Sequence, residues 1–302
     1  MQSQFRLAAL AAALLAAGAA HAGVTFDANI ENDTTFKGKQ GTTKRDTANG
    51  GRIELNAKAE LVKSGDNFVN AKASLIIPTS STDKVGVDDA WIQFGNSAAD
   101  LKIGRQEAAD LFPLGKDVVV EAAASGYGYR ANALRGRKGD GQLHAVAGLN
   151  AAPGLRVELG LVTEKSTLPA VAYGVRPTVV YNSGALTLRA GVESYKKDNV
   201  SYSGTGLSVG YALSEGVNLN LNVANNSDLD AKSVGLNAVI GAAGLGMVQD
   251  KTGANKATTY YAAYSFPLMG VKGASITPAI SSSKATGVEN LSAFKVRLNY
   301  AF

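Results

Sequence analysis

Hydrophobic and polar residues alternate along most of the chain after residue 22, in segments of about ten residues separated by turn residues. The last segment shows the alternation best. One of its faces carries Phe294, Val296, Leu298, Tyr300 and Phe302, and the other carries Ala293, Lys295, Arg297, Asn299 and Ala301. Because successive side chains of a strand point to opposite faces, this pattern predicts strands with one apolar and one polar face. Segments of this length are typical of transmembrane β-barrels.

Turn residues divide the chain into about sixteen predicted strands. In chain order these are 24–35, 50–63, 68–78, 86–95, 101–105, 142–149, 155–163, 174–181, 185–195, 204–213, 217–225, 232–241, 244–251, 257–266, 271–283 and 291–302. Tight turns such as 182–184 alternate with longer links such as 196–203 and 226–231, as the periplasmic turns and outer loops of a bacterial outer-membrane barrel do. We therefore predict an all-β fold: one transmembrane antiparallel β-barrel domain over residues 23–302.

A soluble β-sandwich would alternate in the same way, with its apolar face on a dry core. Two features favour the barrel. Charged residues follow one another on polar faces, as Arg52, Glu54, Lys58 and Glu60 do, which suits the wall of a water-filled pore. Large aromatic residues also lie near strand ends, where the aromatic girdles of a membrane barrel are expected. They are Phe94, Tyr181, Tyr195, Phe266, Tyr300 and Phe302.

The first 22 residues have the pattern of a cleaved signal peptide. Arg6 lies in a short polar start, residues 7–17 are apolar, and Ala20-His21-Ala22 is a small-residue cleavage site. A membrane-spanning helix is the competing interpretation, but the apolar run is shorter than the ~20 residues that a span needs. We therefore expect an exported protein whose mature part begins at Gly23.

Composition narrows the classes of function. The chain has no cysteine, so disulfides and thiolate metal sites are excluded. Its formal net charge of +5 is dispersed along the sequence, unlike the clustered basic surface of a nucleic-acid-binding protein. We expect no nucleic-acid partner, no metal and no cofactor.

One long segment, residues 106–141, remains between the fifth and sixth predicted strands. Loops of this length are usually functional or disordered. This one mixes the apolar run 111–114 with charged residues, so we expect it to fold against another part of the chain. Its charged residues are Glu107, Asp110, Asp117, Glu121, Arg130, Arg135 and Arg137.

Three sequence features resemble the general porins of Gram-negative bacteria, the trimeric family of sixteen-stranded outer-membrane barrels. Residues 89–95 and 101–106 are similar to that family's fourth strand, turn and fifth strand, with the step Gly104-Arg105-Gln106. The terminal Phe302 is similar to the signal read by the barrel-assembly machinery. The resemblance implies a homotrimer surrounded by outer-membrane lipid and lipopolysaccharide, with segment 106–141 folded into the pore as a constriction.

The segment departs from the acidic tip that is common in this family. Leu114-Gly115-Lys116-Asp117 stands in its place, and three arginines add positive charge. We therefore do not infer, from the resemblance alone, that this chain shares the mild preference for cations that is usual in the family.

Strict alternation assigns nine basic residues to the pore wall: Arg52, Lys58, Lys72, Lys102, Arg156, Arg176, Arg189, Lys295 and Arg297. Five acidic residues share this face: Glu54, Glu60, Asp89, Glu158 and Glu193. Fixed charges of one sign concentrate counter-ions, so this majority favours anions, unless the charges are paired along the wall. Arg105 has lipid-facing parity, and we expect a bulge at Gly104 to turn it inward near the constriction.

Trp91 falls on the pore face, and Tyr127 and Tyr129 lie in the long segment. Aromatic rings beside hydrogen-bonding groups could stack on sugars, so a saccharide-selective porin is an alternative. The simpler interpretation is that Trp91 packs the long segment against the wall.

An outer-membrane hydrolase is the enzymatic alternative, but His144 is the single histidine after the signal peptide and has no evident catalytic partner in sequence. We therefore predict a protein that is not an enzyme and that lets small hydrophilic solutes and ions diffuse passively.

Overall fold

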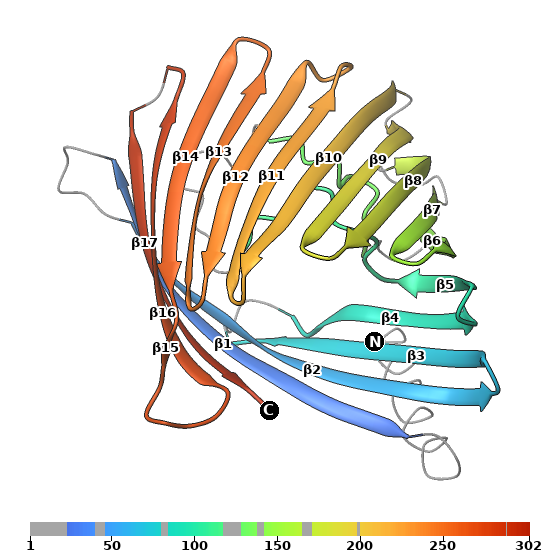
Figure 1. The fold of residues 1–302 in the computed structure, drawn as a ribbon. Helices are drawn as coiled ribbons and strands as arrows, with labels where there is room; N and C mark the ends of the chain where they lie inside the picture. Colours follow the sequence, from blue (N-terminus) through green and yellow to red (C-terminus); the bar gives the residue numbers. More distant parts are fainter. Residues whose placement is uncertain are drawn as a thin grey trace.

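The computed structural model describes residues 23–39, 46–79, 84–116, 128–137, 142–164, 171–197, 200–287 and 289–302. The predicted signal peptide lies outside the described residues, as do Asp117, Glu121 and Tyr127. The described residues form one antiparallel sheet that closes on itself, because β1 pairs with both β2 and β17. Figure 1 shows the strands wrapped around a central space.

Seventeen strands are labelled in this sheet. They are β1 (Val24–Lys39), β2 (Asp46–Ser64), β3 (Asn67–Pro78), β4 (Gly86–Gly95), β5 (Ala99–Arg105), β6 (Gln142–Ala152), β7 (Leu155–Glu164), β8 (Val171–Ser183), β9 (Leu186–Lys197), β10 (Val200–Ser214), β11 (Val217–Asn226), β12 (Ala231–Ile240), β13 (Ala243–Thr252), β14 (Asn255–Tyr264), β15 (Phe266–Pro267), β16 (Ala274–Ala285) and β17 (Leu291–Ala301). The short β15 follows β14 after one residue, and both pair with β16. They form one interrupted strand, so the barrel has sixteen strands, as predicted.

Each predicted strand has its counterpart, and the differences lie at the ends. The long link expected at 196–203 is wrong, because β9 and β10 continue their ladder up to the pair Lys197–Val200. Polar side chains such as Lys196 and Ser201 do not end a strand here, since backbone hydrogen bonds hold the ladder and water reaches the side chains. No helix among the described residues is long and apolar enough to cross a membrane.

The two faces of the sheet differ in polarity. On β11 the outward Leu219, Leu221 and Val223 are exposed, whereas the inward Asn222 is fully buried. A water-soluble fold would bury the large apolar residues and expose the amides. The reverse arrangement is that of a barrel whose outer wall faces lipid and whose inner wall faces a polar interior.

Aromatic residues gather on the outer wall near the end of the barrel where the chain begins and ends. Phe266, Tyr300 and Phe302 are exposed there, and the rings of Tyr300 and Phe302 lie 5.4 Å apart. The predicted place of Tyr195 is wrong, because this residue faces inward and is buried beside Tyr202 and Leu134. The turns at this end are short, so it is the periplasmic end.

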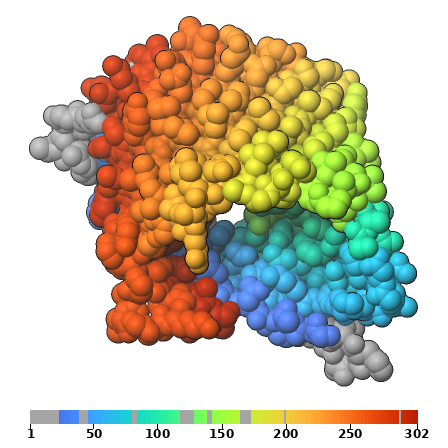
Figure 2. All heavy atoms as spheres, in the orientation of Figure 1, coloured from blue at the N-terminus to red at the C-terminus, as the bar shows by residue number. Residues whose placement is uncertain are grey.

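The space-filling view shows an opening between the yellow and orange strands and the blue and teal strands (Figure 2).

Adjacent residues of β11 test the assignment of the faces. We expect Leu221→Lys to destabilise the barrel by about 2–4 kcal/mol, because it places a charge against lipid. Asn220→Lys, one residue away on the inner face, removes a hydrogen bond to Asn237 and should cost about 1 kcal/mol. Urea unfolding in lipid vesicles measures both, and equal costs would contradict the assignment.

Candidate pore constriction

A bulge in the wall creates the first attachment point of segment 106–141. Between β3 and β4 the register passes from Ala73–Ala90 to Leu75–Val87, so Ser74 faces two residues of β4. Asp88 and Asp89 are consecutive in sequence, yet both are buried on the inner side. Strict alternation predicted only Asp89 there. The signal in the sequence is the aspartate pair itself, since one of two adjacent charges in a regular strand would face lipid.

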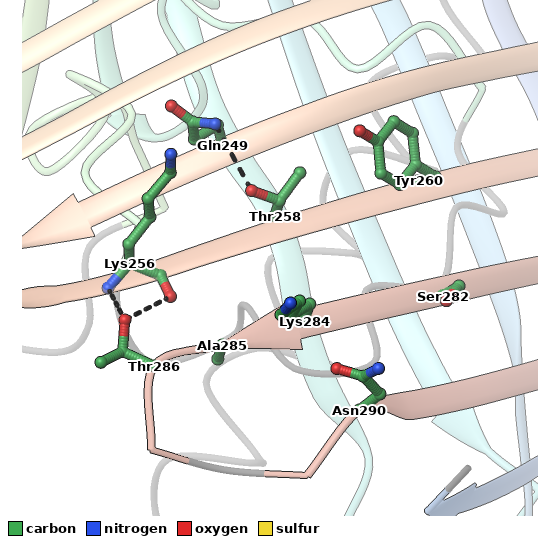
Figure 3. A pocket seen from close by; sticks show the side chains of 9 residues that line it. All are labelled: Gln249, Lys256, Thr258, Tyr260, Ser282, Lys284, Ala285, Thr286 and Asn290. Atoms are coloured by element: carbon green, nitrogen blue, oxygen red, sulfur yellow. Dashed lines mark hydrogen bonds between the residues drawn. The ribbon is translucent and has the colours of Figure 1, made fainter.

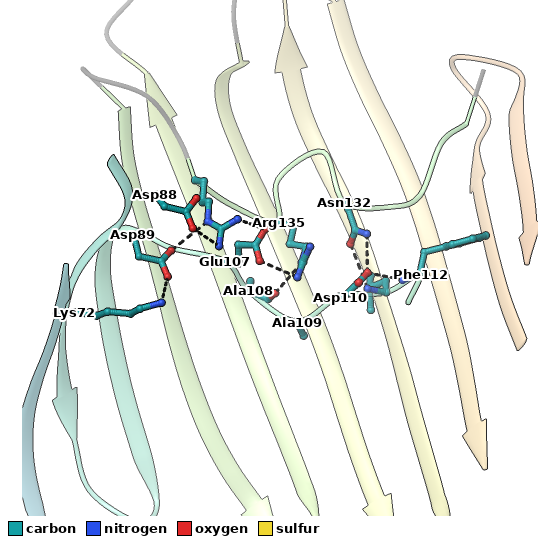
Figure 4. A network of polar contacts seen from close by, with 12 residues as sticks. Lys72, Asp88, Asp89, Glu107, Ala108, Ala109, Asp110, Phe112, Asn132 and Arg135 are labelled. Atoms are coloured by element: carbon teal, nitrogen blue, oxygen red, sulfur yellow. Dashed lines mark hydrogen bonds and ion pairs between the residues drawn. The ribbon is translucent and has the colours of Figure 1, made fainter. Parts of the chain in front are cut away.

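Arg137 binds this acidic site. Its guanidinium lies 2.9 Å from Asp88, 3.3 Å from Asp89 and 3.3 Å from Glu107. Burial would lower the pKa of Arg137, but these three carboxylates together raise it above its ordinary value. Figure 4 shows the network continuing from Asp89 to Lys72 on one side and from Glu107 to Arg135 on the other.

The second attachment is a buried ion pair. Arg176 on β8 and Glu193 on β9 approach to 3.1 Å, with side chains 1% and 0% exposed. Arg176 donates to the carbonyl oxygens of Ala109 and Ala131. A single pair of wall residues thus contacts both arms of the segment, since Ala109 precedes the undescribed part and Ala131 follows it.

Glu193 completes this contact on the second arm. It accepts hydrogen bonds from the backbone N–H groups of Ala133 (3.0 Å) and Leu134 (2.8 Å) and from the hydroxyl of Tyr129 (2.8 Å). Burial and then the charge of Glu193 raise the pKa of Tyr129, so its hydroxyl keeps its proton and goes on donating. Further hydrogen bonds offset the cost of burying a charge pair, and the segment supplies most of them, although the Nη1 atom of Arg176 is buried without a hydrogen-bond partner among the described residues.

The part of the segment around residues 111–116 lies across β11–β14, behind the strands as drawn in Figure 1. The carbonyl oxygen of Pro113 accepts hydrogen bonds of 2.8 Å from both Asn222 and Asn237. Tyr261 donates to the carbonyl oxygen of Leu114 over 2.9 Å, and Lys116 donates to Ser265 over 2.8 Å. These strands therefore hold the segment through its backbone.

Apolar side chains fill the contact beneath these hydrogen bonds. Leu111 and Phe112 are buried with Val248 and Ala224 of the wall. Arg130 pairs with Asp250 of β13 and lies over the ring of Phe112, 4.7 Å from its centroid. The inner face here mixes apolar residues with buried polar ones such as Asn222 and Asp250 where the segment covers it.

Glycines of the wall permit this close approach. A Cβ atom at Gly235 would lie 2.8 Å from the ring of Phe112, and one at Gly191 would lie 2.8 Å from Leu111. Both distances are shorter than side chains tolerate. At these two positions the absence of a wall side chain lets Phe112 and Leu111 approach the backbone of the wall.

The part of the wall from β17 to β2 carries a row of ion pairs. Arg297 contacts Asp33 at 2.8 Å and Glu31 at 3.4 Å, and Arg52 contacts Glu31 at 3.1 Å. Lys295 pairs with Asp33 and Lys58 with Asp27. The four predicted basic residues of this part of the wall are inward, and each of them faces a carboxylate.

The predicted majority of nine basic over five acidic wall residues was incomplete. Six further carboxylates pair with inward cations: Asp27, Glu31, Asp33, Asp88, Asp100 and Asp250. Within the described ranges, Lys102, Lys116 and Arg189 have no carboxylate partner. The ring of Trp91 lies 4.7 Å from the ammonium group of Lys102. On the acidic side, Asp100 and Glu158 share the single cation Arg156, and the partners of Asp110 are amide groups.

Arg105 and Asp110 hold the backbone of the segment. Arg105 donates to the carbonyl oxygens of Val87 and Arg137, so it is turned inward as predicted. The bulge predicted at Gly104 is not present, because the β4–β5 register runs without a shift; a positive φ at this glycine accompanies the turn instead. Asp110 accepts from Phe112 and Asn132 and thereby fixes a turn.

Arg156 and Glu158 form a separate group on β7. Arg156 lies 2.7 Å from Asp100 and 2.8 Å from Glu158. The carboxylates of Asp100 and Glu158 thus both lie on the inner face of the wall, where the alternation had placed Glu158. His144 on β6 is also inward and 1% exposed, a wall histidine as expected.

Comparisons with known proteins agree with this geometry. A family model described as porin-like glycoporin RafY matches residues 15–151. The solved structure of an anion-selective porin from Comamonas acidovorans has a TM-score of 0.70 at 14% identity and covers 93% of this chain and 100% of its own. A mutant of the Rh. blastica porin has a TM-score of 0.64 at 14% identity, with 92% and 100% covered. No curated protein sequence matches the chain.

The fold defines the class of this protein: an outer-membrane β-barrel of sixteen antiparallel strands. The family model and the solved structures confirm the resemblance to the Gram-negative porins, and the chain has the porin fold.

The buried pair can be tested against a charge on the same strand. Glu193→Gln leaves Arg176 buried without a counter-charge, a loss of about 3–5 kcal/mol, which we expect to release the segment and give a larger and noisier single-channel current. Arg189→Gln removes a charge four residues away, at a residue with no hydrogen bond or ion pair to the described parts of the segment, and should leave the noise unchanged. Equal noise in the two variants would contradict the role of Glu193.

Proposed function

We propose that this protein is a passive diffusion channel through the outer membrane for small polar or charged solutes and ions. One observation carries the proposal. The described parts of segment 106–141 are bound to the wall at β8–β14 and, through Arg137, at β4, while ion pairs line the wall from β17 to β2. A barrel with a filled core would instead bury apolar side chains on all sides of its interior.

The segment acts as the constriction in this proposal. Both of its described arms are tied to the wall, so it narrows the interior from a fixed position. Solutes pass between the segment and the row of ion pairs on β17, β1 and β2, and selection is by size and charge without energy input. Asp117 and Glu121, which lie outside the described residues, belong to the same proposed constriction.

We base a preference for anions on the three basic residues that have no carboxylate partner within the described ranges. Paired charges largely cancel at a distance, whereas Lys102, Lys116 and Arg189 keep their field, and cationic side chains lining a pore favour anions. The similar structure from Comamonas acidovorans is described as anion-selective, which supports the same property here.

Saccharide selectivity is the second candidate, because the matching family model is described as a glycoporin. Of the predicted stacking residues, Tyr129 is buried and donates to Glu193, so its ring is not offered to a solute. Trp91 remains, with Lys102 over its ring. One aromatic ring gives a weaker basis for sugar binding than a series of rings would.

Fold and family point to a channel rather than an enzyme. We also propose export by the signal peptide 1–22, with Phe302 read by the barrel-assembly machinery. A homotrimer is supported by small outward residues in neighbouring register positions: Ala57 is paired with Ala73, and Ala73 with Ala90. Small side chains allow close contact between subunits.

Planar-bilayer recording under a salt gradient tests the function. We expect stepwise conductance and a reversal potential of the sign given by chloride. Sugars added to one side should leave the current unchanged; current block by an oligosaccharide, lost in Trp91→Ala, would favour the second candidate. Absence of steps from folded protein would contradict a diffusion channel.

The source of selectivity has its own test. Lys102→Gln, Lys116→Gln and Arg189→Gln combined should lower the ratio of chloride to potassium permeability severalfold, because they remove the charges without partners. The matched control, Lys58→Gln with Asp27→Asn, removes both members of an ion pair, so it leaves the net charge unchanged and should keep the parental ratio. If the triple variant keeps the parental ratio, the proposed source is wrong.

A further inference from the structure

Asp100 and Lys102 lie two residues apart on the inner face of β5, yet they form no ion pair. Both oxygens of Asp100 are already bonded: Gln93 donates to Oδ1 over 2.9 Å, and Arg156 donates to Oδ1 over 3.1 Å and to Oδ2 over 2.7 Å. The ammonium group of Lys102 lies instead 4.7 Å from the centre of the Trp91 ring. Because this cation has no carboxylate partner among the described residues, it is available to the charge of a solute.

Amide side chains lie beside this cation on the inner wall. Gln93 of β4 is the register partner of Lys102 and also of Asn70 on β3. Trp91 is two residues from Gln93 on the same strand, so the four side chains share the inner face. Each of the four residues is partly exposed. A ring, two amides and an ammonium group thus lie together on three adjacent strands.

This group of side chains lies on the periplasmic side of the constriction. β5 runs from a periplasmic turn to the start of segment 106–141, and Lys102 is in the middle of the strand. Figure 4 shows the segment attached at Asp88 and Asp89, which precede Trp91 on β4. A solute that has passed the constriction therefore meets Trp91 and Lys102 before it leaves the pore.

Other lysines of the barrel lack this setting. Lys256 and Lys284 line a groove together with amide and hydroxyl groups (Figure 3). Lys256 has the parity of Tyr260, which is exposed on the outer wall, so solutes in the pore do not contact this groove. Of the three inward basic residues without a carboxylate partner in the described ranges, Lys102 is the one that lies over an aromatic ring.

The three kinds of group suit different parts of one solute. An ammonium group binds a carboxylate through charge-assisted hydrogen bonds, and side-chain amides both donate to and accept from hydroxyl groups. An indole ring offers a large apolar face. A hydroxylated ring that carries a carboxylate presents partners for all three, whereas a neutral sugar lacks the charge and a short carboxylate lacks the ring.

We propose that Trp91, Gln93, Lys102 and Asn70 form a binding site for sugar acids. The carboxylate of a hexuronate binds Lys102, its hydroxyl groups bind Gln93 and Asn70, and its ring lies on Trp91. This inference rests on the proposed function and names a class of solute for it. The glycoporin model and the anion-selective porin that resemble this chain carry in their descriptions the two properties that a sugar acid combines.

The test uses purified full-length protein in detergent and measures the binding of galacturonate by calorimetry, with galactose and acetate as comparison solutes. We expect galacturonate to bind at least fivefold more tightly than either of them. Lys102→Gln and Trp91→Leu should each lower the affinity for galacturonate at least fivefold. The matched control Arg189→Gln removes another inward cation without a carboxylate partner, on β9, and should keep the parental affinity.

Equal affinities for galacturonate and acetate would overturn the proposal, since charge alone would then account for binding. Equal affinities for galacturonate and galactose would overturn it too, because Lys102 would have no part in recognition. Equal losses in Lys102→Gln and Arg189→Gln would assign the effect to the overall charge of the pore and not to this site. Heat-modified gel mobility shows that each variant has folded.

Bilayer recording of the same samples separates this result from the proposed function. Protein that conducts in steps but does not bind galacturonate contradicts the sugar-acid site and leaves the diffusion channel standing. Calorimetry needs no current, so the site is tested even where the conductance is not observed.

Discussion

The buried pair of Arg176 and Glu193 is the interaction on which the interior arrangement depends. Two opposite charges inside a protein are costly unless other groups satisfy their remaining donors and acceptors. Here the backbone of segment 106–141 satisfies most of them from both arms, while the Nη1 atom of Arg176 has no partner among the described residues. The segment needs the pair for its position, and the pair needs the segment for its hydrogen bonds. This mutual dependence fixes one geometry for a long connection that would otherwise have many.

The rest of the interior is organised around this position. Where the segment lies, the wall combines glycines and small apolar residues with buried polar side chains that bond to the segment. Where the segment is absent, the wall carries ion pairs that keep charged side chains extended along the barrel. The two surfaces face the same space with different chemistry, and that difference leaves room for water and solutes on one side of the interior.

Alternation along the sequence predicted the barrel and its sixteen strands because each strand separates lipid from a polar interior. The alternation did not predict the inner face under segment 106–141, because apolar and charged residues share that face. Val248 and Asp250 share the inner face of β13 under the segment, so an apolar residue and a charge have the same parity there. Tyr195 was assigned to lipid for the same reason, although it packs against Leu134 of the segment. Contacts between distant parts of the chain decide these positions, and the local pattern does not contain them.

Asp27, Glu31 and Asp33 could have been predicted as inward, since they alternate within one predicted strand. Their pairing with Arg297 and Arg52 could not, because it depends on the register across β17, β1 and β2. The bulge that turns Asp88 inward is likewise a matter of register. The pattern thus predicts which charges are inside, whereas the net field in the pore depends on pairs that only the closed barrel brings together.

The account's central claim is that the segment stays on the wall while solutes pass beside it. The chain has no cysteine, so one introduced disulfide can test this. A Cβ atom at Gly206 would lie 2.6 Å from that of Ala131, and a shift of about 1 Å would bring the pair to disulfide geometry. The measurement is the single-channel conductance of Ala131→Cys/Gly206→Cys, oxidised and reduced. The account predicts the same open conductance in both states, whereas a channel that closes on oxidation would show that the segment must leave the wall for solutes to pass.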